Sequence, residues 1–108
     1  MVKRIIWTDK FSKSLESLFA CLHSIYSIGT LRKLGKDITR NELLLPDNPQ
    51  MGSIEESLSG LQYEYRSIVI KPYFKIIYRN DKEDIYFIDI WDTRRDPSLL
   101  KKNIEESL

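Results

Sequence analysis

The stretch from Gln62 to Arg95 decides the fold, and it reads QYEYRSIVIKPYFKIIYRNDKEDIYFIDIWDTRR. It holds three short runs rich in Ile, Val, Tyr and Phe, which are separated by Lys71-Pro72 and by Asn80-Asp81-Lys82-Glu83. Aromatic and β-branched residues favour strands, whereas Pro, Asn and Asp mark the turns between them. The pattern therefore predicts a three-stranded antiparallel meander.

The chain before this stretch has a helical pattern. A short β-type run, KRIIW, is followed by Thr8 and Asp9, and either side chain can cap a helix. Apolar residues then recur every three or four positions over about residues 9–28: Phe11, Leu15, Leu18, Leu22 and Ile25. A break is expected at Gly29-Thr30, with a second helix after it from the spacing of Leu31, Leu34 and Ile38. The two segments predict a helical hairpin that packs on the meander.

The remaining segments are shorter. The run from Pro46 to Gly52, PDNPQMG, predicts a loop, and residues 53–60 fit either one helical turn or an irregular approach to the next strand. Asp96-Pro97 predicts the start of a short C-terminal helix, because proline suits the first helical position. The sequence thus predicts an α+β fold, with residues 1–108 forming a single domain.

Composition excludes several classes of function. With 17 Lys and Arg against 16 Asp and Glu, the net charge of +1 does not indicate a polyanion partner. Cys21 is the single cysteine, so no internal disulfide is expected, and no apolar run has the length of a signal peptide or a membrane span. A cytoplasmic protein without a metal or a cofactor is expected, with the lone His23 at a helix surface or core edge.

Strand parity sorts the meander into two faces, because neighbouring side chains point to opposite sides. The helices are expected to cover the face that holds Phe74, Ile76, Ile88 and Ile90. The other face is expected to be exposed and to present Lys75, Asp89 and Trp91, with Arg66 added if Ser67 and Val69 point inward. As a simple alternative, Lys75 and Asp89 are cross-strand partners on a solvated surface.

The order of these elements resembles that of the RelE/ParE superfamily of bacterial type II toxins. The resemblance is carried by Leu44 and the Pro46–Gly52 break, by Tyr65-Arg66-Ser-Ile-Val, by Tyr73 to Arg79, and by the segment from Ile88 to Pro97. It implies a small toxin that a cognate antitoxin neutralises by wrapping around it. RelE-like members cut mRNA on the ribosome, whereas ParE-like members poison DNA gyrase, and the shared fold does not choose between the two.

The resemblance also implies site residues. In the RelE-like pattern Arg66 and Lys75 match basic strand positions, and Arg94 or Arg95 matches the basic residue after the last strand. The C-terminal tyrosine of that pattern is missing, because DPSLLKKNIEESL contains neither Tyr nor His. The ParE-like alternative makes this face a binding surface, with the candidates Tyr73, Arg79, Asp89, Trp91 and Arg95.

Three functions therefore stay open on the sequence. The first is a toxin that poisons gyrase or another protein, which the missing C-terminal acid or base favours. The second is a ribosome-dependent mRNA endonuclease that uses Arg66, Lys75 and Arg94. The third is a non-toxic binding module that kept only the fold.

Overall fold

The structure is a computed structural model that describes residues 3–20, 27–71 and 73–107. The described helices and strands, in chain order, are β1 (Arg4–Trp7), α1 (Asp9–Ala20), α2 (Ile28–Leu44), the 3₁₀ turn η1 (Leu45–Asp47), β2 (Ser53–Ile54), the 3₁₀ turn η2 (Glu56–Leu58), β3 (Tyr65–Ile70), β4 (Phe74–Asn80), β5 (Asp84–Asp92) and α3 (Pro97–Ser107). The predicted α+β class is confirmed, and residues 53–60 hold both a short strand and a helical turn.

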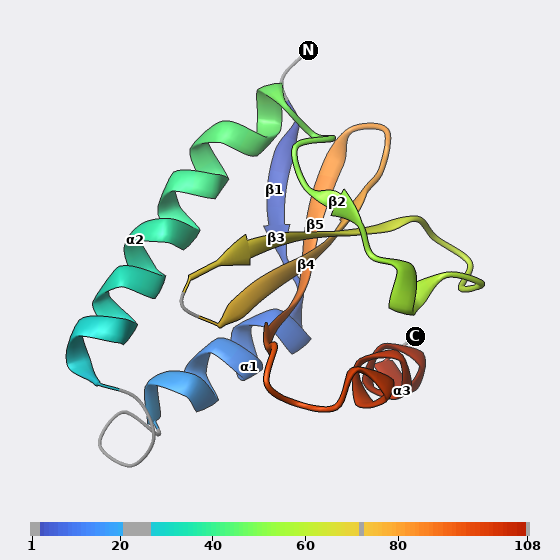
Figure 1. Cartoon of the computed structure of the whole chain (residues 1–108). Helices are drawn as coiled ribbons and strands as arrows, with labels where there is room; N and C mark the ends of the chain where they lie inside the picture. Colours follow the sequence, from blue (N-terminus) through green and yellow to red (C-terminus); the bar gives the residue numbers. More distant parts are fainter. Residues whose placement is uncertain (1–2, 21–26, 72, 108) are drawn as a thin grey trace.

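The sheet has five strands in the order β1-β5-β4-β3-β2 (Figure 1). Its centre is the predicted antiparallel meander of β3, β4 and β5. The N-terminal run forms β1 and pairs in parallel with β5, while the two residues of β2 pair antiparallel with β3 at the other edge. The meander is thus extended on both sides by short strands.

Side-chain caps set the starts of the helices. Thr8 caps α1, because its Oγ1 atom accepts a hydrogen bond from the Phe11 amide at 3.1 Å. The predicted break at Gly29-Thr30 is wrong: Ser27 caps α2, its hydroxyl accepts from the Thr30 amide at 3.1 Å, and both residues lie inside the first turn. The rest of the predicted first helix, including Cys21, Leu22, His23 and Ile25, lies outside the described residues.

The main core lies between the two long helices and one face of the sheet, which we call the hairpin face. Phe11 of α1 and Leu31, Leu34 and Ile38 of α2 are buried there. The strands contribute Phe74, Ile76 and Tyr78 from β4, and Ile85, Phe87 and Ile90 from β5. The helices were expected to cover the sheet face that holds Phe74, Ile76 and Ile90, and the structure confirms this.

A β-bulge changes the predicted parity of β5. Ile77 pairs with Asp89, but the next residue, Tyr78, pairs with Phe87, so Ile88 is an extra residue. Because one extra residue turns the following side chains to the other face, Phe87 and Ile90 both reach the hairpin face. Ile88 instead joins a second cluster on the opposite face, so its predicted place is wrong.

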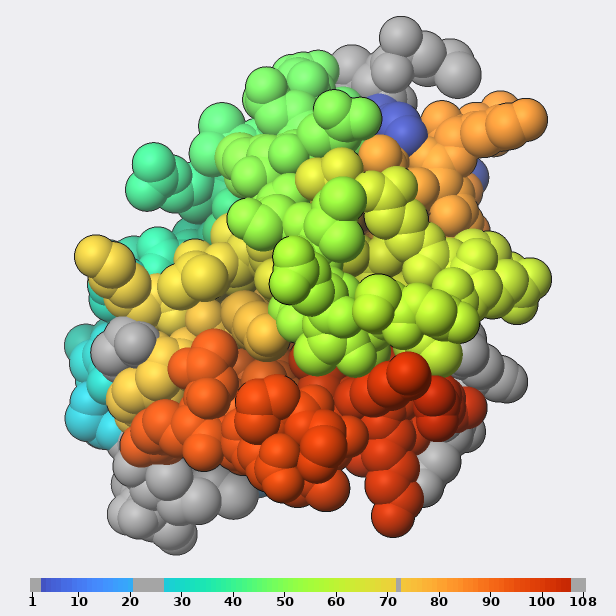
Figure 2. Space-filling view, turned by 45° about the vertical axis from the view of Figure 1, so that its right-hand side comes forward, coloured from blue at the N-terminus to red at the C-terminus, as the bar shows by residue number. Residues whose placement is uncertain are grey.

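The second face of the sheet is covered and not exposed, contrary to the expectation. We call it the α3 face, because Leu100 and Ile104 of α3 pack on it together with Leu58 of η2. In Figure 2 the red C-terminal helix lies against the yellow-green segment that carries η2. Trp91 is therefore only 2% exposed, and Asp89 3%. The two covered faces give the small sheet a core on each side.

Candidate functional site

Arg66 and Lys75 lie on opposite faces of the sheet. Val69 pairs with Lys75, and Arg66 pairs with Tyr78 of the hairpin face. Cross-strand partners share a face, so Ser67 and Val69 point to the α3 face and Arg66 does not. Arg66 donates from Nη1 to the Gly52 carbonyl at 2.8 Å, and its Nη2 lies 3.1 Å from the Glu64 carboxylate. The condition that would have brought Arg66 beside Lys75 is not met.

Lys75 forms an ion pair with a residue far away in the sequence. Its Nζ lies 2.6 Å from Oε1 of Glu55, and both side chains are largely buried. Burial acts to raise the pKa of Glu55, but hydrogen bonds from Lys75, Ser57 and Ser67 outweigh it and hold the pKa below 4.5. Lys75 pairs across the sheet with Trp91 and not with Asp89, so the cross-strand Lys75–Asp89 partnership is wrong.

Two arginines follow β5, each stacked on an aromatic ring. The Arg94 guanidinium lies 3.7 Å from the Tyr73 ring centroid and 2.7 Å from the Asp92 carboxylate. That of Arg95 lies 4.3 Å from the Trp91 ring centroid. Both arginines are exposed, and a ring holds the flat face of each, while the Nε and Nη2 atoms of Arg94 also bond to Asp92. We call this exposed Arg94-Arg95 turn, together with Tyr73, the arginine rim.

Arg79 lies farther along β4, between two tyrosines. Its guanidinium carbon is 4.1 Å from the Tyr63 ring centroid and 4.6 Å from that of Tyr86. Its Nη2 atom also lies 3.2 Å from the Asp81 carboxylate. The side chain therefore joins the segment before β3 to β5.

Asp89 is a buried carboxylate at the junction of β5 and α1. Its Oδ1 atom accepts from the Ile90 amide at 2.9 Å, and its Oδ2 atom lies 3.8 Å from Nζ of Lys10. Burial raises the pKa of Asp89, and Ser14 and Lys10 only partly oppose that effect. The sequence reasoning missed Lys10, although Lys10, Lys13 and Ser14 recur with helical spacing on the polar side of α1.

The predicted site residues thus divide into three places. Lys75, Arg79, Asp89 and Trp91 lie on the α3 face, Tyr73, Arg94 and Arg95 at the rim, and Arg66 across the sheet. In residues 3–20, 27–71 and 73–107, no three His, Cys, Asp or Glu side chains come together to hold a metal ion. No helix of those ranges is long and apolar enough to cross a membrane.

Comparison with known proteins decides the family. A family model described as the ParE toxin of the type II toxin-antitoxin system parDE matches residues 5–97. The chain belongs to the ParE toxin family. The resemblance inferred from the order of elements and from the break and meander motifs is therefore confirmed, and this ParE-family chain is a toxin of a type II toxin-antitoxin system.

Solved structures share the fold of this ParE-family toxin. A chain from the chromosomal ParDE system of P. aeruginosa superimposes with a TM-score of 0.63 at 16% identity, over 84% of this chain and 96% of that one. YafQ from E. coli strain BL21(DE3) gives 0.51 at 20% identity, over 85% and 94%. A chain of the E. coli DinJ-YafQ toxin-antitoxin complex gives 0.52 at 16% identity, over 87% and 96%. No curated protein is a significant match to the sequence.

Proposed function

We propose that this ParE-family toxin inhibits growth by binding a protein target, with DNA gyrase as the first candidate, and that a cognate antitoxin neutralises it. The observation that carries the proposal is the position of Arg66, which lies across the sheet from Lys75. A ribonuclease site built on Arg66, Lys75 and Arg94 requires these cations around one phosphate.

The chemistry of RNA cleavage supports the same conclusion. Attack by the 2′-hydroxyl needs a group to accept its proton, a cation to stabilise the developing charge, and an acid to protonate the leaving oxygen. Lys75 is held by Glu55 and Arg94 by Asp92. The C-terminal segment after Arg95 offers neither Tyr nor His as the acid. An active endonuclease would require these ion pairs to open and a proton donor to come from elsewhere.

The arginine rim is the surface that we assign to the target. Arg94 and Arg95 are exposed and already oriented by the rings of Tyr73 and Trp91. Arginine and aromatic residues are enriched among the side chains that contribute most to protein interfaces. In this proposal Trp91 and Asp89 are supporting residues, since both are buried.

An antitoxin partner is part of the proposal because of the toxin family and the solved relatives. The matching structures are described as a ParDE system and as a DinJ-YafQ toxin-antitoxin complex. Coexpression with the product of a neighbouring gene is expected to restore growth to cells that produce this toxin.

The test compares two target assays with three variants. Purified toxin is expected to inhibit supercoiling by DNA gyrase and to leave ribosome-bound mRNA intact. Lys75→Ala is expected to retain growth arrest at equal expression, whereas Arg95→Glu relieves it. Arg40→Glu, the same charge reversal at an exposed position of α2, is the control and is expected to stay toxic.

The opposite results define the alternatives. Codon-positioned mRNA cleavage that Lys75→Ala abolishes would establish the endonuclease instead. Absence of any growth defect on induction, alone or with the neighbouring genes, would leave a non-toxic binding module.

A further inference from the structure

A cavity of about 510 Å³ lies between the start of α1, the sheet and α3. Lys10, Lys13 and Ser14 of α1 line one side of it. Tyr65 and Arg79 line it from the sheet, and Ile88 and Ile104 add apolar surface. The volume is in the range of sites that bind small molecules. Of these residues only Arg79 was a candidate on the sequence.

Two buried polar atoms beside this cavity lack an acceptor. The Tyr65 hydroxyl and the Arg79 Nε atom form no hydrogen bond of normal length and angle with any described residue. The charge of Arg79 and a hydrogen-bond contact with it both act to lower the pKa of Tyr65, although that contact does not reach normal hydrogen-bond length and angle. Burial raises the pKa of Tyr65 more than the charge of Arg79 lowers it, so the hydroxyl remains a donor at neutral pH. Arg79 Nε can only donate, and the Tyr65 hydroxyl can donate as well as accept, so an acceptor placed here would satisfy both groups.

The charges around the cavity favour an anion. Lys10, Lys13 and Arg79 carry positive charge among the lining residues, against one negative charge on Asp9. Lys10 lies 3.8 Å from Asp89, a distance too long for a hydrogen bond. Lys13 is exposed and forms no ion pair with another described residue. Lys13 is thus without a carboxylate partner among the described residues, while Lys10 and Arg79 each have one, Asp89 and Asp81, and keep further N–H donors for an acceptor-rich ligand.

We propose that this cavity binds the phosphate group of a small molecule, with a mononucleotide as the class of ligand that fits its volume. A phosphate offers several oxygens at once, which two lysines, Arg79 and the Tyr65 hydroxyl can share. Each of the two unpartnered atoms exposes less than 1 Å², so a side-chain rotation accompanies binding. The ligand bridges α1 and α3, because Ser14 and Ile104 lie on its two sides.

This proposal is independent of the toxin's target, since the cavity does not include Arg94 or Arg95. Whether or not the toxin inhibits DNA gyrase, the proposal of a phosphate site is unaffected. The residues that test it are also separable. Tyr65→Phe removes only the hydroxyl, and Lys13→Gln removes an exposed charge.

The experiment titrates the purified full chain with AMP, inorganic phosphate and adenosine at low ionic strength. Binding is followed by calorimetry and by the backbone amide signals of Lys10, Lys13 and Ser14. Saturable binding of AMP is expected, with no response to adenosine. If inorganic phosphate binds as tightly as AMP, free phosphate is identified as the ligand. If AMP binds more tightly than inorganic phosphate, a phosphate monoester is identified. Either result supports the phosphate site.

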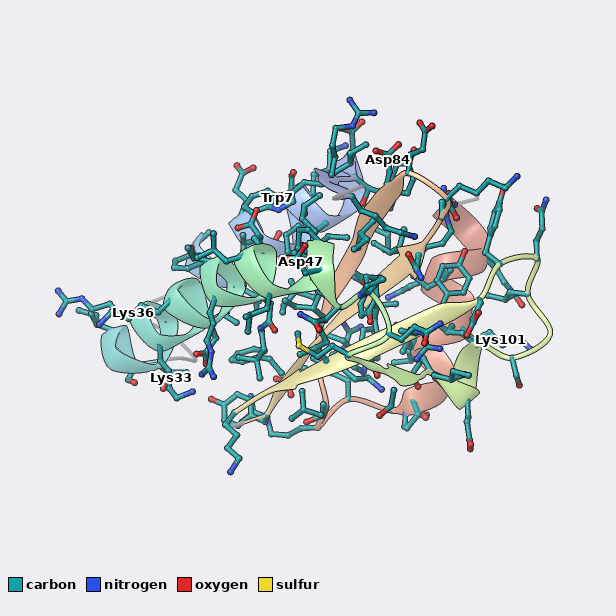
Figure 3. All side chains as sticks on the ribbon, turned by 90° about the horizontal axis from the view of Figure 1, so that it is seen from above. Trp7, Lys33, Lys36, Asp47, Asp84 and Lys101 are labelled. Atoms are coloured by element: carbon teal, nitrogen blue, oxygen red, sulfur yellow. The ribbon has the colours of Figure 1, made fainter. Side chains whose placement is uncertain are left out.

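Variants connect the binding to the cavity. Tyr65→Phe and Lys13→Gln are each expected to raise the Kd for AMP by about tenfold. Lys36→Gln is the matched control, because Lys36 is an exposed lysine of α2 on the other side of the molecule from Lys101 of α3 (Figure 3). The proposal is overturned if neither AMP nor phosphate binds saturably. It is also overturned if Lys36→Gln weakens binding as much as Lys13→Gln.

Discussion

Lys75 Nζ lies 2.6 Å from Glu55 Oε1, and this ion pair connects the segment between β2 and η2 to the start of β4. Glu55 thus pairs with Lys75, a cation that the RelE-like pattern assigns to catalysis. It also joins two residues that are 20 positions apart in the sequence. In this arrangement Lys75 therefore stabilises the fold through Glu55, and its ammonium group is not free to contact a substrate.

Glu55→Gln is expected to lower the free energy of unfolding by about 2 kcal/mol near neutral pH, because Lys75 loses its charged partner. Since the folded pKa of Glu55 lies below its ordinary 4.5, its ionised form stabilises the fold above that pH. The contribution is lost as the pH falls through the folded pKa. Urea unfolding of both proteins at about pH 7 and about pH 3 should show the difference shrinking in acid. A difference that is equal at both pH values would contradict the role of the ion pair.

Asp89→Asn should show the opposite pH trend. The folded pKa of Asp89 is raised above 3.8, so the folded protein holds this proton more tightly than the unfolded chain does. Stability from this group is greatest below 3.8 and is lost as the pH rises through the folded pKa. Because the unchanged protein loses this stability as the pH rises and the amide does not, the stability of Asp89→Asn relative to the unchanged protein is expected to increase from about pH 3 to about pH 7. Near neutral pH the free energies of unfolding of the two proteins are expected to differ by less than about 1 kcal/mol. A loss of several kcal/mol near neutral pH would mean that the Lys10–Asp89 attraction outweighs burial.

Gly52→Ala is expected to destabilise the fold by about 2 kcal/mol. A methyl group there would lie 2.7 Å from the Ser67 carbonyl oxygen and 2.9 Å from the Tyr78 hydroxyl. That hydroxyl accepts from the Gly52 amide and donates to the Pro49 carbonyl, so its position is fixed. Gly35→Ala is the matched control: it meets no atom within 4 Å and lies inside α2. It should stabilise by about 0.5–1 kcal/mol. Thermal and urea unfolding measure both, and two changes of the same sign would refute the steric account.

Leu100→Ala is expected to cost about 2–4 kcal/mol of unfolding free energy. Leu100 is fully buried against the α3 face, in the cluster that contains Trp91. Leu99→Ala provides the comparison, because the neighbouring leucine is 40% exposed and both changes alter the same helix. It should cost less than about 1 kcal/mol. Equal costs in urea unfolding would show that α3 does not pack on the sheet in solution.

Much of the fold follows from local pattern. Aromatic and β-branched runs between Pro, Asn and Asp turns predicted β3, β4 and β5, and Asp96-Pro97 predicted α3, whose first turn Asp96 caps by accepting from the Ser98 amide at 3.0 Å. These signals act within a few residues, so the chain alone is enough to find them. The superfamily resemblance rested on the same order of elements.

The sequence by itself determined which segments become helices and strands, and the tertiary structure decided which side chains meet. The bulge at Ile88 depends on how β5 pairs with β4, and it moved Phe87 to the hairpin face. The register of β3 placed Arg66 across the sheet from Lys75, and α3 covered Trp91. Each outcome depends on contacts between distant residues, where one position of register reverses every face. Local propensity carries no information about that register.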